Sequence, residues 1–239
     1  MTQMDSTKKQ ARIAGVLYTL VALTAPFSLI YVPGKLIVTG DATATADHIR
    51  ASELLLRMGI ASELFHQTIE VFLVLVLYVL FKGVNKSLAR QMALLGFMPI
   101  PIVFLNVLNE VAALILVSGA SFLAVFDKLQ LDALAMLFIR LHSLGLQVAS
   151  IFWGLWLFPF GLLIIRCGFI PKALGILVII AGLGYLLGTF NYLILPHPVS
   201  ILGDVAGILE LGEPPIILWL LIWGAKAQSS SANLPSIAK

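Results

Sequence analysis

The chain alternates between long apolar stretches and short polar connections, and six of the apolar stretches are long enough to cross a lipid bilayer. A membrane-spanning helix needs about 20 mainly apolar residues, each rising about 1.5 Å. Unpaired backbone groups are not tolerated in hydrocarbon, so all six stretches should be helical. The pattern predicts an all-α integral membrane bundle within residues 12–225, with six transmembrane helices at 12–32, 54–81, 88–118, 133–165, 172–195 and 204–224.

The predicted spans differ in length, and the second, third and fourth are longer than a bilayer requires. Overlong spans tilt, kink or project beyond the lipid. The first span follows Lys8, Lys9 and Arg12 but exceeds the roughly 7–15 apolar residues of a cleaved signal peptide. We therefore expect a retained first helix after a cytoplasmic segment at 1–11. The Ser-containing segment 226–239 is expected to be a disordered cytoplasmic tail.

The longest connection on the predicted outer side, residues 33–53, contains a short helical pattern. Asp41 suits an N-cap, and the segment 42–52 that follows it favours a helix. We expect this helix to lie at the outer membrane interface as a partial lid.

Composition supports a lipid environment. Hydrophobic residues make up 60% of the 239 residues and charged residues only 11%, against roughly 45–50% and 25% in soluble domains. No basic run with interleaved aromatic residues accompanies the net charge of +3, so nucleic acid is not an expected partner. The expected partners are membrane lipids and, because six helices are few for a transporter, a second copy of the chain.

The distribution of basic residues predicts the orientation, since Lys and Arg collect on the cytoplasmic side. With both termini cytoplasmic, ten basic residues face inward and four face outward. The inner set is Lys8, Lys9, Arg12, Lys82, Lys86, Arg90, Arg166, Lys172, Lys226 and Lys239, and the outer set is Lys35, Arg50, Arg57 and Lys128.

Polar residues inside the spans concentrate between mid-membrane and the outer interface. Glu63, His66 and Glu70 occupy an arc of roughly 60° on one face of the second span. Intramembrane ionisable groups cost at least about 2.5–3.5 kcal/mol each, which makes them functional candidates. The sequence predicts an outward-facing acidic pocket between spans two, three, four and six, with the candidates Glu63, His66, Glu70, Asn106, Glu110, Arg140, His142, Glu210 and Glu213.

Prolines interrupt the sixth span next to two of these acids. Pro214 and Pro215 lack an N–H, so the carbonyls of Glu210 and Leu211 should be left free beside the carboxylates and could attract a cation. A pair of prolines two residues apart interrupts the third span as well. Such paired interruptions resemble the broken helices of inverted-repeat transporters.

Glu63-x-x-His66 is the one pattern with metal-ligand spacing. Glu-x-x-His on helices binds di-iron or di-manganese centres, but such sites need a second copy of the motif, which the sequence lacks. A Glu–His hydrogen bond between helices is the favoured interpretation, and no cofactor is expected. His142 is either a further ligand or a similar interhelical bond.

Two other patterns concern packing. Arg140 is expected to neutralise Glu70 or Glu110, since intramembrane charges usually pair, and an anion-binding role is the alternative. Small residues on the fifth span predict a close helix-packing face made by Gly175, Gly182, Gly184 and Gly188.

Three classes of function remain open. The first is a small-molecule or cation/proton-coupled carrier, and the second is a structural or sensory membrane protein. The third is an intramembrane enzyme for a lipid-like substrate, with Glu63 and His66 as acid/base groups or metal ligands. Phosphate-binding loops, nucleophile elbows and zinc-peptidase motifs are absent from the sequence, so no catalytic residue can be named.

Short stretches spread along the chain resemble a bacterial membrane family known as domain of unknown function 4386. The resemblance runs from about residue 11 to 224 and implies a bacterial cytoplasmic-membrane protein, without assigning a role to any residue. The stretches are Ala11-Arg12-Ile13-Ala14-Gly15, Gly40-Asp41-Ala42, Ala51-Ser52-Glu53, Arg57-Met58-Gly59, Val84-Asn85, Gly168-Phe169-Ile170-Pro171, Leu174-Gly175 and Ala181-Gly182-Leu183-Gly184-Tyr185.

Overall fold

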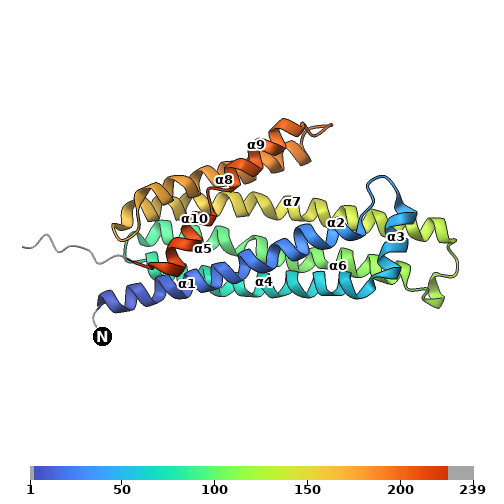
Figure 1. Ribbon diagram of the computed structural model, residues 1–239, viewed down its shortest axis with the longest axis horizontal. Coiled ribbons are helices and arrows are strands. Elements are labelled where there is room, and N and C mark those ends of the chain that lie inside the picture. Colours follow the sequence, from blue (N-terminus) through green and yellow to red (C-terminus); the bar gives the residue numbers. More distant parts are fainter. Residues whose placement is uncertain (1–2, 226–239) are drawn as a thin grey trace, which may run out of the picture.

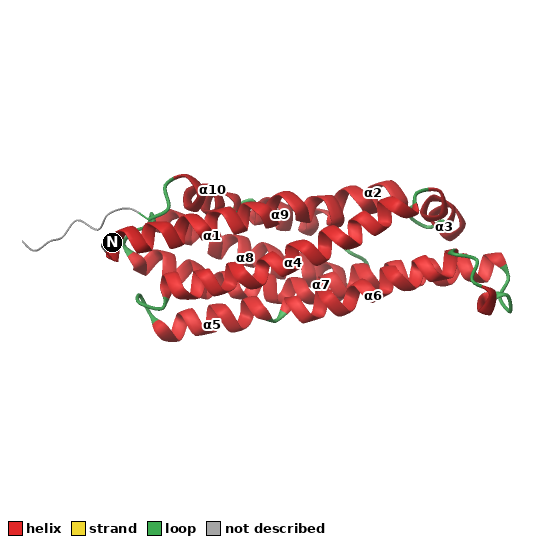
Figure 2. Cartoon of the chain, turned by 90° about the horizontal axis from the view of Figure 1, so that it is seen from below, coloured by secondary structure: helices red, strands yellow, loops and turns green. Residues whose placement is uncertain are grey.

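The computed structural model describes residues 3–225, which form an elongated bundle of helices without strands (Figures 1 and 2). The disorder expected for 226–239 lies outside the described residues. In chain order the elements are α1 (Gln3–Pro26), the π-helical turn η1 (Phe27–Tyr31), α2 (Val32–Leu36), α3 (Ala42–Ala51), α4 (Glu53–Phe81), α5 (Lys86–Phe97), α6 (Pro99–Val117), the 3-10 turn η2 (Ser121–Leu123), α7 (Lys128–Cys167), α8 (Lys172–Leu193), α9 (Ser200–Glu210) and α10 (Pro214–Ile222).

Six helical units of the described chain are long and apolar enough to span a membrane, which confirms the predicted all-α bundle. They are Ser6–Leu36, Glu53–Phe81, Lys86–Val117, Lys128–Cys167, Lys172–Leu193 and Ser200–Ile222. The fourth has 40 residues and is roughly 60 Å long, about twice the thickness of the hydrocarbon core. The chain is therefore a multi-pass membrane protein whose longest helix is longer than one crossing of the bilayer requires.

The predicted short helix after the first span is present as α3. The Asp41 side chain accepts a hydrogen bond from the Ala44 N–H at 2.9 Å, as expected of an N-cap. Ala46 and Ile49 of α3 are buried in an apolar cluster that includes residues of α6 and α7. This burial fixes α3 across one end of the bundle, where Figure 1 shows it.

A charged network ties α3 to the first turn of α7. Arg50 forms an ion pair with the fully buried Asp132, and Lys128 reaches the other oxygen of Asp132 at 2.8 Å. Asp47 bridges the same two cations at 2.6 Å and 3.1 Å. Hydrogen bonds from Lys128 and then Arg50 lower the pKa of the exposed Asp47 carboxyl below its ordinary value.

Prolines break the helices where the sequence predicts. The third span divides at Pro99 into α5 and α6, and the sixth divides at Pro214 into α9 and α10. The expectation of a free Glu210 carbonyl is wrong, because the chain turns there. The N–H of Glu213 donates to that carbonyl at 3.0 Å.

Glycines bring α7 and α8 into backbone contact. A Cβ added at Gly161 would lie 2.5 Å from the Gly175 carbonyl oxygen, and one added at Gly175 would lie 2.6 Å from that of Gly161. The pair Gly154 and Gly182 shows the same reciprocal approach, at 2.9 Å and 2.8 Å. Gly184 instead faces the backbone of α9. A close-packing face on the fifth span is therefore confirmed, and it serves two neighbouring helices.

Two apolar cores flank a polar zone in the middle of the bundle. On α4 the core that contains Ile49 of α3 ends at Leu56, and the second core begins at Leu73. On α7 the corresponding residues are Ile139 and Trp156. Buried ionisable and amide side chains fill the intervals between them, so the candidate site lies between the two cores.

Candidate functional site

The polar zone contains a cavity of about 570 Å³, called here the acidic cavity. Residues of α1, η1, α4, α7, α8, α9 and α10 line it. Its carboxylates are Glu70, Glu210 and Glu213, and no lysine or arginine of the described chain is among its lining residues. Glu70 lies 11 residues before the end of α4 at Phe81, about 17 Å along the helix axis.

Two tyrosines hold Glu213 in place at the break between α9 and α10. The Tyr18 hydroxyl of α1 donates to one carboxylate oxygen, and the Tyr185 hydroxyl of α8 donates to the other at 2.9 Å. Tyr18 is only 4% exposed. Hydrogen bonds to a charged acceptor are stronger than neutral ones, so this carboxylate connects three segments that are distant in sequence.

Two buried side chains of α4, His66 and Gln67, line the acidic cavity. His66 is 2% exposed and Gln67 is 1% exposed. The Nδ1 atom of His66 and both polar atoms of the Gln67 amide have no partner among the described residues. A buried polar group left unpaired costs about 1–3 kcal/mol. The unpaired Gln67 amide is therefore a candidate hydrogen-bonding group at the cavity wall.

Irregular backbone borders the same cavity on two sides. The π-helical turn after Pro26 contributes Leu29 and Ile30, and the α9–α10 break contributes Glu213 and Pro214. π-helical turns occur frequently at functional sites. Non-helical backbone at membrane depth is tolerated where protein buries it or where it lines a cavity. Both interruptions therefore fit a binding cavity better than a lipid-facing surface.

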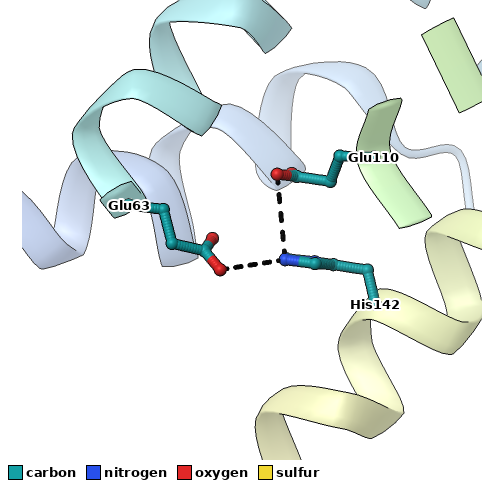
Figure 3. Close-up of side chains that lie close together, drawn as sticks. All are labelled: Glu63, Glu110 and His142. Carbon is teal, nitrogen blue, oxygen red and sulfur yellow. Dashed lines mark hydrogen bonds and ion pairs between the residues drawn. The ribbon is translucent and has the colours of Figure 1, made fainter. Parts of the chain in front are cut away.

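A second polar site lies outside the acidic cavity, where α4, α6 and α7 each contribute one buried side chain (Figure 3). The His142 Nε2 atom is 3.1 Å from Oε1 of Glu63 and 3.8 Å from Oε2 of Glu110. One ligand atom from each residue lies within 4.8 Å of the others. Their exposed fractions are 0% for Glu63, 5% for Glu110 and 6% for His142. We call this group the Glu–Glu–His cluster.

Asn106 supports the Glu–Glu–His cluster from α6. Its Nδ2 donates to the backbone carbonyl of His142 at 2.8 Å, and Asn109 donates to its Oδ1 at 3.0 Å. The absence of a side chain at Gly145 makes room for Asn106, since an added Cβ would lie 2.8 Å from Asn106 Nδ2. Asn106 thus joins α6 to α7 and positions the helix turn that carries His142.

A smaller cavity of about 190 Å³ adjoins the cluster and is lined by Glu110, His142 and, from α3, Ile49. Leu29 and Gln147 line both this cavity and the acidic cavity. They therefore lie between the two polar sites.

The structure places the residues of the predicted pocket between spans two, three, four and six in two neighbouring sites. The acidic cavity involves spans one, two, four, five and six, while the cluster involves spans two, three and four. Of the predicted residues, the acidic cavity receives His66, Glu70, Glu210 and Glu213, and the cluster receives Glu63, Glu110 and His142 with Asn106 beside it.

Arg140 belongs to neither site, and its expected pairing with Glu70 or Glu110 is wrong. It is exposed and forms no ion pair with any residue that the structure describes. The reason is helical geometry. Arg140 precedes His142 by two positions, which is about 200° around α7, so one of them faces outward when the other faces the bundle.

Tyr18, Gln67 and Tyr185 contribute to the acidic cavity and were not predicted. Tyr18 follows Ala11 and Ala14 at the spacing of residues that share one face of a helix, and all three side chains are buried. The sequence signal was therefore a hydroxyl on the packed face of the first span. For Gln67 and Tyr185 the sequence offers only their polarity as a signal. The residues around them are nearly all apolar, so hydrophobic periodicity does not show which helix face is buried.

Comparison with curated proteins and with solved structures gives no match. One family model matches residues 13–224, which is most of the chain. The protein therefore belongs to the family described as domain of unknown function (DUF4386).

Proposed function

We propose that this protein is a small-molecule or cation carrier, coupled to protons or cations, and that the acidic cavity is its binding site. The observation that carries the proposal is the lining of the cavity, with three carboxylates and no lysine or arginine among the described residues. A volume of about 570 Å³ lies within the roughly 300–1,000 Å³ of small-molecule sites.

The lining favours a positively charged occupant with an apolar body. Glu70, Glu210 and Glu213 supply negative charge in a low-dielectric region, where electrostatic attraction is strong. Trp153 and Trp156 add aromatic surface to the wall, and tryptophan faces attract cations at up to about 2 kcal/mol when desolvated. An organic monocation satisfies both features.

Protons suit the coupling role because they compete for the same groups. A carboxylate that binds a cation must release its proton, and a proton that returns displaces the cation. Glu70 is the best candidate for this exchange, since it is 6% exposed and no hydrogen bond or ion pair of its side chain is found in the described chain. Glu213, by contrast, is held by two tyrosines.

The interrupted helices provide places where the bundle could bend around the occupant. Broken helices whose ends meet at the midplane form the binding sites of many secondary transporters. In this chain the α9–α10 break carries Glu213 directly into the acidic cavity. The helix termini at this break are therefore expected to move when a cation binds.

The proposal includes a setting in a bacterial cytoplasmic membrane, with both termini on the cytoplasmic side. The excess of basic residues at the ends carrying Lys82, Lys86 and Arg166 supports that orientation. Surrounding lipids and a second copy of the chain are the proposed partners, and nucleic acid is not.

Uptake of ethidium by DNA-loaded proteoliposomes under an imposed pH gradient tests the carrier role. Uptake should exceed that of protein-free vesicles and stop when an ionophore dissipates the gradient. Glu70→Gln should lose at least about 90% of the uptake. The matched control is Asp204→Asn, which removes an exposed carboxylate outside the cavity and should leave uptake unchanged. Equal uptake by wild type and Glu70→Gln would contradict the proposal.

A further inference from the structure

The geometry points to a site for a divalent transition-metal ion at the Glu–Glu–His cluster, bound by Glu63, Glu110 and His142. This inference goes beyond the carrier proposal and does not depend on it, because none of the three residues lines the acidic cavity. The three side chains come from α4, α6 and α7 and point toward one another (Figure 3).

Charge balance supports a divalent ion. The cluster buries two carboxyl groups beside a single imidazole. A buried charge without full compensation is costly in a bilayer and in a protein interior. A divalent cation held by two carboxylates and a neutral imidazole leaves no net charge. No lysine or arginine forms an ion pair with either carboxylate in the described part of the chain.

Unpartnered ligand atoms provide an independent indication. The Oε2 atoms of Glu63 and Glu110 are buried and have no hydrogen-bond partner among the described residues. A single hydrogen bond, at 3.1 Å from His142 to Glu63, does not satisfy two carboxylates. An ion at the centre of the cluster would satisfy both.

The spacing suits a tetrahedral first-row ion. Ligands about 2.1 Å from such an ion are roughly 3.4 Å apart. The observed separations of 3.1 Å and 3.8 Å from His142 Nε2 lie on either side of that value. Imidazole nitrogen with carboxylate oxygen is a donor set for Zn²⁺, Fe²⁺ or Mn²⁺, whereas Mg²⁺ and Ca²⁺ prefer oxygen alone.

The surroundings resemble those of metal sites that react with small molecules. Asn106 fixes the backbone of His142 at 2.8 Å, and such outer contacts orient metal ligands. Three protein ligands leave a fourth position open. Glu110 and His142 also line the cavity of about 190 Å³, so a water molecule or a small substrate could reach that position.

The test measures metal binding by the full chain in detergent, after removal of bound ions with a chelator. Zn²⁺, Mn²⁺ and Fe²⁺ (the last without oxygen) are added separately, and bound metal per chain is determined by elemental analysis after dialysis. We expect one ion per chain for at least one of these metals. His142→Gln and Glu110→Gln should each weaken binding at least tenfold. Co²⁺ should give visible absorption bands typical of four or five ligands, and His142→Gln should abolish them.

His48→Gln is the matched control, since it removes another histidine, exposed on α3, that belongs neither to the cluster nor to the acidic cavity. It should keep full binding. Wild type that is folded and binds none of the three metals overturns the inference, whatever the variants do. Equal losses in His48→Gln and His142→Gln also overturn it, because the metal would then be held elsewhere. Failure of ethidium uptake alone leaves this prediction standing.

Discussion

The Tyr18 hydroxyl donates to a Glu213 carboxylate that also accepts from Tyr185, and Tyr18→Phe removes that one bond without changing the ring. Neutral interhelical hydrogen bonds in membranes contribute about 0.6 kcal/mol on average, while bonds to charged groups contribute about 1.5–3 kcal/mol. Tyr18 is 4% exposed, and the second donor to Glu213, Tyr185, stays in place in the variant. We expect Tyr18→Phe to lower the free energy of unfolding by about 1.5 kcal/mol.

Equilibrium unfolding of the purified protein in mixed micelles, with increasing dodecyl sulfate, measures this cost. Glu213→Gln keeps an acceptor but removes its charge, so in that background Tyr18→Phe should cost only about 0.6 kcal/mol. Tyr192→Phe is the control, because Tyr192 is 47% exposed on α8. This substitution should change stability by less than about 0.5 kcal/mol. An equal cost of Tyr18→Phe in both backgrounds would refute the charged hydrogen bond.

Three further predictions concern stability. Asp132→Asn should destabilise the protein by about 1–3 kcal/mol. This cost is smaller than that of breaking a fully buried ion pair, because the basic partners of Asp132 are partly exposed. Chemical unfolding measures the cost, and an unchanged stability would contradict the network. Gly161→Val should reduce the yield of folded protein in size-exclusion chromatography, whereas Gly207→Val, whose Cβ would meet nothing within 4 Å, should not; equal yields would argue against close α7–α8 packing. The lowered pKa of Asp47, caused first by Lys128, means that its contribution to stability is present above its unfolded pKa of about 4 and is lost as the pH falls through its folded pKa. Asp47→Asn should therefore flatten the pH dependence of unfolding below about pH 4, and an unchanged profile would contradict this assignment.

The membrane fold was predictable because its constraints are local. Each span is recognised from about 20 neighbouring residues, and proline breaks a helix by its own covalent structure. The breaks at Pro99 and Pro214 and the α3 helix after Asp41 all follow from such short-range rules. The π-helical turn after Pro26 was not predicted, because its geometry depends on the neighbours that pack around it.

The division into two sites was not predictable from the sequence. Helical spacing places Glu63 and His66 on one face of α4, yet Glu63 meets α6 and α7 while His66 lines the acidic cavity. Which residues face each other depends on helix crossing angles and on small residues such as Gly145, which makes room for Asn106. The partners of Glu213 came from the first and fifth spans, and no local pattern links those segments.

The acidic cavity should select for positive charge, and equilibrium dialysis with two ions of matched shape tests this selectivity. Tetraphenylphosphonium and tetraphenylborate differ mainly in the sign of their charge. The account predicts saturable binding of the phosphonium, weakened at least tenfold in a Glu70→Gln/Glu213→Gln variant that remains folded, and no saturable binding of the borate. Binding of the borate as tight as that of the phosphonium, or phosphonium binding that survives both substitutions, would contradict it.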